Sequence, residues 1–428
     1  MTAAIIFTLL FVLLLTGMPI SIALGMTVLL FLFTLTRVPL EAVAMKLFTG
    51  IEKFEIMAIP FFILAGNFLT HGGVARRLVN FATALVGHFH GGLGIAGVIA
   101  CALFAAISGS SPATAAAIGS IMIPAMLKAG YPLRFGAGSI ATAGALGILV
   151  PPSIVLVMYA VSTNTSVGAL FMAGIVPGVV LAVLLSLTTW YQARKHNYPR
   201  QPRASLGEIW HTFQQSSWGL LLIVIVLGGI YSGMFTPTEA AAVSAVYSFI
   251  VAVYVYRVLP LSHVPKVLLA SANMSAMLLY IITNATLFSF LLTHENIPQQ
   301  MALWMLDQGL SAFSFLLVVN LILLLAGDFM EPSSIVLIMA PILFPIAIKL
   351  GIDPVHFGIL ITVNMEVGMV TPPVGLNLYV VSGLIDRGLT EVTIAAIPWM
   401  ITTLVFLMLV TYWPTLSLWL PRMLGMIR

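Results

Sequence analysis

Hydroxyl side chains gather next to glycine and proline in one otherwise apolar region of the sequence. Ser108, Ser110, Ser111 and Thr114 lie within seven positions, and a proline pair follows at 151–152. Hydroxyl oxygens, and backbone carbonyls freed where a helix is interrupted, are hard ligands of the kind that alkali cations prefer. This combination favours an ion-binding site.

A second region of the chain repeats this pattern. Region 329–374 matches region 108–153 at a nearly constant spacing: Lys128 recurs as Lys349, and the proline pair recurs 221 residues later at 372–373. Two Gly/Pro-interrupted apolar segments, one in each half of a membrane protein, indicate the binding site of a transporter. Polar residues that could contribute to the second copy are Ser333, Ser334, Asn364, Thr371 and Asn377.

Serine and threonine also have a structural role in apolar helices. Small side chains let membrane helices approach one another closely, without binding any ligand. For scattered residues this alternative is the better explanation. The duplication of both the hydroxyl cluster and the proline pair favours the ion site here.

Three carboxylates, Asp328, Glu331 and Glu366, lie in apolar surroundings where a charged group is costly and usually functional. We consider two roles for them, a part in a cation path or neutralisation by a neighbouring basic group. The corresponding positions of the first copy hold no carboxylate. This asymmetry disfavours direct ligation by carboxylates at both sites.

The composition shows which class of protein positions these residues. The chain is 61% hydrophobic and 7% charged, against about 25% charged residues in soluble domains. Its long apolar runs predict a polytopic α-helical membrane protein, and they lack the strict alternation of an outer-membrane barrel. We attribute the net charge of +4 to membrane orientation rather than to nucleic-acid binding.

We expect the first repeat half to span residues 1–192. Its hairpin spans about 93–128, because two apolar arms of about fifteen residues are too short to cross a bilayer separately. A broken helix follows at about 135–161. Residues 193–215 are polar and basic, which predicts a cytoplasmic connecting loop.

The second half is expected over residues 216–428, with a hairpin at about 329–349 and a broken helix at about 356–382. Thr236, Pro237 and Glu239 have the spacing of a capping box at a helix start. We therefore interpret Glu239 as a helix cap rather than as a proton carrier.

Enzyme interpretations fit the sequence poorly. Ser108-Gly109 lacks the preceding glycine of an intramembrane serine protease motif, and Gly327-Asp328 lacks the second motif of an aspartyl protease. The eight histidines have no metal-binding spacing. We expect no catalytic residue.

The sequence resembles the large membrane subunit, of the DctM-like type, of tripartite ATP-independent periplasmic (TRAP) transporters. The segments that carry this resemblance cover nearly the whole chain; they are 58–66, 141–153, 235–243, 327–332 and 368–377. The resemblance implies an elevator-type transporter with scaffold and transport parts. It also implies two inverted repeats, each with a re-entrant hairpin and a discontinuous helix.

In that family Na⁺ sites lie between each hairpin tip and the facing broken helix. Carried onto this chain, the implied ion- and substrate-binding residues are Ser108, Gly109, Ser110, Ser111, Thr114, Gly144, Gly147 and Pro151 in the first half, and Gly327, Asp328, Met330, Glu331, Ser333, Gly368, Thr371, Pro372 and Asn377 in the second. The residues assigned to Na⁺ itself are Ser108, Ser110, Gly147, Gly327, Gly368 and Thr371.

The resemblance also implies partners and a location. A small four-helix membrane subunit, expected as a separate polypeptide, and a soluble periplasmic binding protein would complete the system in the bacterial inner membrane. The expected activity is Na⁺-coupled uptake of a C4-dicarboxylate or similar carboxylate, with no cofactor besides Na⁺. The alternative is a stand-alone Na⁺/carboxylate carrier that needs no binding protein.

Overall fold

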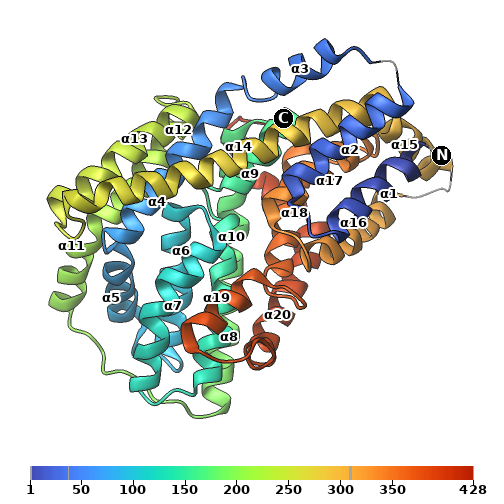
Figure 1. The fold of residues 1–428 in the computed structure, drawn as a ribbon. Coiled ribbons are helices and arrows are strands. Elements are labelled where there is room, and N and C mark those ends of the chain that lie inside the picture. The colour runs from blue at the N-terminus through green and yellow to red at the C-terminus, as the bar shows by residue number, and fades with distance from the viewer. Residues whose placement is uncertain (1, 37, 308–310, 428) are drawn as a thin grey trace.

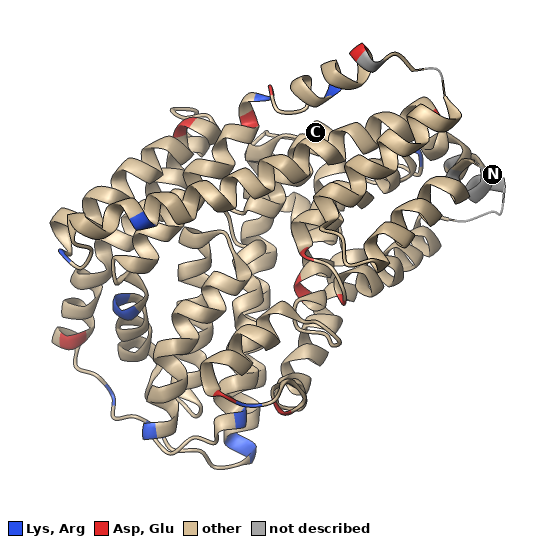
Figure 2. Cartoon of the chain, in the orientation of Figure 1, with Lys and Arg blue, Asp and Glu red and all other residues tan. Residues whose placement is uncertain are grey.

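The structure is a computed structural model that describes residues 2–36, 38–307 and 311–427 (Figure 1). All regular secondary structure in these ranges is helical, and seven helices there are long and apolar enough to cross a membrane. Lysines and arginines lie mainly at helix ends and in connections, while most helix bodies carry no charge (Figure 2). The prediction of an all-α polytopic membrane protein is confirmed.

The helices of the first half are α1 (Thr2–Leu15), α2 (Ile20–Leu35), α3 (Leu40–Thr49), η1 (Phe54–Met57), α4 (Ala58–His71), α5 (Val74–Val86), α6 (Gly92–Ser108), α7 (Ser111–Lys128), α8 (Leu133–Ala143), η2 (Gly144–Ile148), α9 (Ile154–Thr163) and α10 (Val167–Lys195). Helices α6 and α7 pack against each other, and both pack against η2. The expected broken helix is present as α8, η2 and α9.

The helices of the second half are α11 (Leu206–Ile223), η3 (Val224–Gly228), α12 (Gly229–Tyr231), α13 (Pro237–Ile250), η4 (Val251–Val255), η5 (Leu261–His263), α14 (Val264–His294), α15 (Ile297–Asp307), α16 (Ala312–Gly327), α17 (Pro332–Lys349), α18 (Pro354–Gly368), α19 (Leu376–Ile385), α20 (Leu389–Tyr412) and α21 (Thr415–Met423). The long helix α14 lies alongside α2 (Figure 1).

The duplication seen in the sequence extends to the order of the helices. Helices α6 to α10 recur as α16 to α20, and α8 and α18 begin 221 residues apart, at Leu133 and Pro354. Each series consists of two packed helices joined by a tight tip, a broken helix and a long helix. The second broken helix is formed by α18 and α19.

The second hairpin differs from the expected range of 329–349. That range is almost entirely the single helix α17, and the helix before the tip is α16. The Ser311 hydroxyl accepts a hydrogen bond from the Ser314 amide and starts α16 as a separate helix.

The connecting loop is also shorter than the expected 193–215. Helix α10 continues to Lys195, and α11 begins at Leu206. The Ser205 hydroxyl accepts from the Glu208 amide at 3.1 Å, which caps α11. Polar residues after position 205 therefore form a helix, because a capped start compensates for their weak apolar pattern.

The capping box at the start of α13 is confirmed. The Glu239 carboxylate accepts from the Thr236 amide at 2.8 Å, and the Thr236 hydroxyl accepts from the Glu239 amide at 3.3 Å. The capping box thus satisfies two backbone amides at this helix start, those of Thr236 and Glu239.

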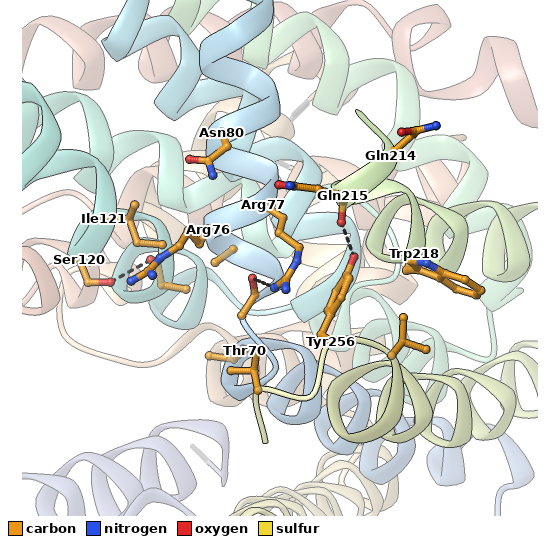
Figure 3. A pocket seen from close by; sticks show the side chains of 15 residues that line it. Thr70, Arg76, Arg77, Asn80, Ser120, Ile121, Gln214, Gln215, Trp218 and Tyr256 are labelled. Carbon is orange, nitrogen blue, oxygen red and sulfur yellow. Dashed lines mark hydrogen bonds between the residues drawn. The ribbon is translucent and has the colours of Figure 1, made fainter. Parts of the chain in front are cut away.

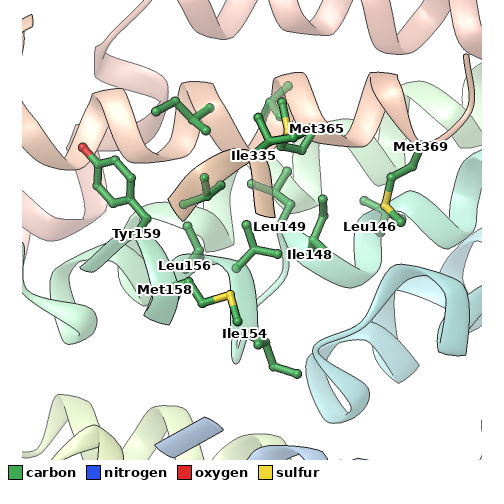
Figure 4. Close-up of a cluster of buried hydrophobic side chains, with 14 of the residues drawn as sticks. Leu146, Ile148, Leu149, Ile154, Leu156, Met158, Tyr159, Ile335, Met365 and Met369 are labelled. Atoms are coloured by element: carbon green, nitrogen blue, oxygen red, sulfur yellow. The ribbon is translucent and has the colours of Figure 1, made fainter. Parts of the chain in front are cut away.

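The two broken helices share one apolar core. Figure 4 shows Leu146 and Leu149 of the first break beside Met365 and Met369, which lie in and directly after α18. Tyr159 of α9 crosses the same interface, where its hydroxyl donates to the Pro354 carbonyl at 2.7 Å. This packing brings the two duplicated regions together in space.

Candidate ion-binding site

The tip of the first hairpin is a tight turn stabilised by its own hydroxyls. Gly109 joins α6 to α7 with a φ of 60°, in the left-handed region that favours glycine. Ser108 Oγ and Thr114 Oγ1 lie 2.9 Å apart, and Thr114 Oγ1 donates to the Ser110 carbonyl at 2.8 Å. The Ser110 side chain makes no hydrogen bond within the described residues, so its hydroxyl is available to a ligand.

This tip lies directly against the first break. A Cβ atom added to Gly147 would lie 2.5 Å from the Ser110 carbonyl oxygen, and one added to Gly109 would lie 2.7 Å from the Pro152 carbonyl oxygen. Gly144 contacts α7 in the same way, at 2.6 Å from the Ala115 Cβ. Backbone meets backbone here, which places carbonyl oxygens of tip and break next to each other.

The second tip repeats this contact with different residues. A Cβ atom added to Gly368 would lie 2.8 Å from the Cα of Gly327. The Asp328 carbonyl accepts a hydrogen bond of 3.1 Å from the Val374 amide, beyond the proline pair. Gly327, Asp328 and Gly368 are therefore brought together, in the pairing that the resemblance implied.

Glu331 and Ser333 serve the helix that follows the second tip. Glu331 is the N-cap of α17, and its carboxylate accepts from the Ser334 amide at 3.2 Å. Its other oxygen accepts from the Ser333 hydroxyl at 2.6 Å. Both oxygens of this carboxylate therefore accept hydrogen bonds at the start of α17, a capping role that the sequence did not predict.

Asn377 was assigned by its position to the second site, but its side chain reaches the first. The amide nitrogen donates to Ser111 Oγ at 2.8 Å and to the Ala141 carbonyl at 3.0 Å. All three residues are fully buried. Helix α19 packs against α7 and α8, which explains why this residue bridges the two halves.

The remaining candidates do not converge on either tip contact. The Thr371 hydroxyl donates to the Val367 carbonyl, near the end of α18, at 2.7 Å, and Pro372 is exposed. Met330 packs against the apolar core, and Pro151 lines an apolar groove beside Gly178. The sequence did not predict the backbone partners Ala141, Pro152 and Val374. Their contacts use carbonyl or amide groups of the main chain, which do not depend on residue type.

Two carboxylates near the second break have buried oxygens without partners. Neither Glu366 oxygen, nor Asp328 Oδ1, makes a hydrogen bond within the described residues, and Glu366 is completely buried. The other expected role was neutralisation by a basic group. The one ion pair among the described residues joins Arg134 to Glu391, so neither Glu366 nor Asp328 is neutralised in this way. A buried carboxylate without a donor is costly in its charged form, so this group is either protonated or paired with a bound cation.

An amide network lies next to Glu366 on α18. Asn364 Nδ2 donates to Asn320 Oδ1 at 3.1 Å, and Asn320 Nδ2 donates to Thr411 Oγ1 at 2.8 Å. The oxygen of the Asn364 amide has no hydrogen-bond partner in the part of the chain that the structure describes. Among the residues described, no group of three His, Cys, Asp or Glu side chains could hold a transition metal. The available ligands are oxygens, which suit a hard cation.

Comparison with known families matches residues 7–416 to the DctM component of the tripartite ATP-independent periplasmic transporter. The chain belongs to this family. The C4-dicarboxylate TRAP transporter large permease protein DctM of Rhodobacter capsulatus is 67% identical, with both chains covered in full. Its counterpart in Pseudomonas aeruginosa is 58% identical over 90% of each chain.

A solved structure shares the fold of this DctM-family chain. The crystal structure of the YdaH transporter of Alcanivorax borkumensis superposes with a TM-score of 0.65 at 16% identity, covering 90% of this chain and 88% of that one. Family membership and the seven apolar helices identify a multi-pass inner-membrane permease. The resemblance and the location inferred from the sequence are thus confirmed.

Proposed function

We propose that this permease takes up a C4-dicarboxylate, or a similar small carboxylate, by Na⁺ symport. The observation that carries the proposal is the backbone contact of both hairpin tips with the facing helix breaks, at Gly147 and at Gly368. Such contacts gather carbonyl oxygens, which bind Na⁺, next to helix N-termini, which favour an anion. The names of the two DctM relatives support the substrate class.

Na⁺ would be bound by oxygens on each side of a tip contact. In the first half these are the Ser110 hydroxyl and carbonyls around Gly147; in the second they are carbonyls near Gly327 and Gly368. Cation binding would draw each tip onto its break and complete the anion site. We expect no other cofactor.

The transport cycle would move the two tips and the two breaks as one body. The shared core between the breaks and the Asn377–Ser111 hydrogen bond support this, because they tie the two copies together. An elevator movement of this body against the remaining helices would then expose the site on either side. A small membrane subunit and a periplasmic binding protein, as the family description implies, would respectively extend the fixed part and deliver substrate.

The test is uptake of labelled succinate by proteoliposomes that contain the permease and its small subunit. An inward Na⁺ gradient is applied with and without the binding protein. Uptake that requires both supports the tripartite symport. Uptake with Na⁺ alone would instead indicate a stand-alone carrier, and uptake independent of Na⁺ would refute the coupling ion.

A further inference from the structure

A cavity of about 830 Å³ is lined by none of the residues of either hairpin tip (Figure 3). Its wall is formed by the first turns of α5, the middle of α7, one face of α11 and the segment 255–258. The volume is within the range of about 300–1,000 Å³ that small-molecule sites occupy. Nothing in the symport scheme above uses this cavity.

Two adjacent arginines give the cavity its charge. Arg76 and Arg77 both line it, and its described wall contains no Asp or Glu. Figure 3 shows the Arg76 guanidinium on the side of Ser120 and the Arg77 guanidinium on the side of Tyr256. Neither arginine forms an ion pair among the described residues. The cavity therefore presents two uncompensated positive charges.

Arg77 is held in place by its neighbours. Its guanidinium lies 3.7 Å from the centre of the Tyr256 ring, and Nη1 donates to the Gly73 carbonyl at 2.9 Å. Tyr256 is fixed in turn by donating its hydroxyl to the Gln215 carbonyl at 2.8 Å. A guanidinium positioned in this way retains free donors for a carboxylate, which it can bind in a bidentate manner.

The start of α5 adds further attraction for an anion. Gly73 supplies no side chain to cap this helix, and the first turn contains no acidic residue. Gly73 and Ala75, at the start of this helix, line the cavity together with the two arginines. Unsatisfied amides at a helix N-terminus favour negative charge.

The location of the cavity suggests when an anion would occupy it. Basic clusters at 194–203 and 257–266 place the adjoining ends of α11 and η4 on the cytoplasmic side. Ser120 belongs to α7, the helix that begins at the first tip with Ser111. We propose that the cavity is a release site, which binds the dicarboxylate by Arg76 and Arg77 after it leaves the tips. This proposal rests on the proposed function for its substrate class.

The first experiment measures succinate binding to the purified permease without Na⁺, a condition in which the tip sites are not charged with their coupling ion. Wild type is expected to bind succinate and to reject succinamide, the uncharged diamide of the same shape. Arg76→Gln is expected to weaken succinate binding about tenfold, since one charge-assisted contact is lost. Arg203→Gln, in the loop before α11, is the matched control and should bind as wild type does.

Several outcomes would overturn the proposal. Equal succinate affinity in wild type and Arg76→Gln would do so, and this variant avoids a folding defect because Arg76 is exposed. Loss of a co-purified anionic phospholipid from Arg76→Gln, with no change in succinate binding, would identify a lipid headgroup site instead. If the wild type binds succinate at this cavity but shows no Na⁺-driven uptake, the proposed symport is contradicted. The anion site is supported in that case.

Discussion

The side-chain amide of Asn377 donates a hydrogen bond of 2.8 Å to the hydroxyl of Ser111. The two residues are 266 positions apart, one after the second proline pair and one at the first hairpin tip. The same amide also donates to the Ala141 carbonyl. One side chain therefore connects the second broken helix to both elements of the first ion-binding candidate.

Asn377→Ala is expected to destabilise the permease by about 1–3 kcal/mol, because it leaves Ser111 and Ala141 buried without their donor. Thermal unfolding in detergent measures this effect. In a double-mutant cycle, Asn377→Ala and Ser111→Ala should be non-additive by about 1 kcal/mol. Additive losses would show that the two residues stabilise the protein independently.

Gly368→Ala is expected to abolish most Na⁺-driven uptake while the protein still inserts. Its Cβ would lie 2.8 Å from the Gly327 Cα, and backbone on both sides cannot give way without separating tip and break. Gly383→Ala in α19 is the matched control, since nothing lies within 4 Å of its Cβ position. Retained uptake in Gly368→Ala would contradict a functional contact between tip and break.

Much of this architecture follows from sequence because glycine and proline are both unfavourable inside a regular helix. The first hairpin and both breaks lie close to the expected ranges, since each break contains a proline pair, which a continuous helix does not readily accommodate. The second hairpin was placed too late because hydropathy does not reveal the separate start of α16. That start depends on one hydroxyl, at Ser311.

The site itself was only partly predictable. The sequence singled out Ser110, Gly147 and Gly368 as candidates, and the structure places all three at contacts between a tip and a break. The sequence could not assign Asn377 to the first tip, because that contact depends on how two halves of the chain pack. The sequence also could not show that Glu331 caps α17. A glutamate at this position could bind a cation if its side chain pointed away from the helix start.

Thr236→Val is expected to lower the free energy of unfolding by about 1 kcal/mol, because it removes the hydroxyl that caps α13. Uptake per folded molecule should not change, since the hydrogen bonds of this cap join Thr236 only to Glu239. Thermal unfolding and uptake in the same preparation check both parts. An altered Na⁺ dependence would refute the interpretation of this segment as a purely structural cap.

Glu366→Gln is expected to raise the Na⁺ concentration for half-maximal uptake several-fold. Both carboxylate oxygens are buried without partners, two residues before the Gly368 contact, so replacing one by an amide nitrogen removes a hard ligand from a cation path. Uptake is measured across a Na⁺ titration at fixed succinate. Glu239→Gln is the matched control, because that carboxylate caps a helix start at the surface. An unchanged Na⁺ dependence in Glu366→Gln would exclude Glu366 from the cation path, and a loss of folded protein would show that the carboxylate is needed for packing instead.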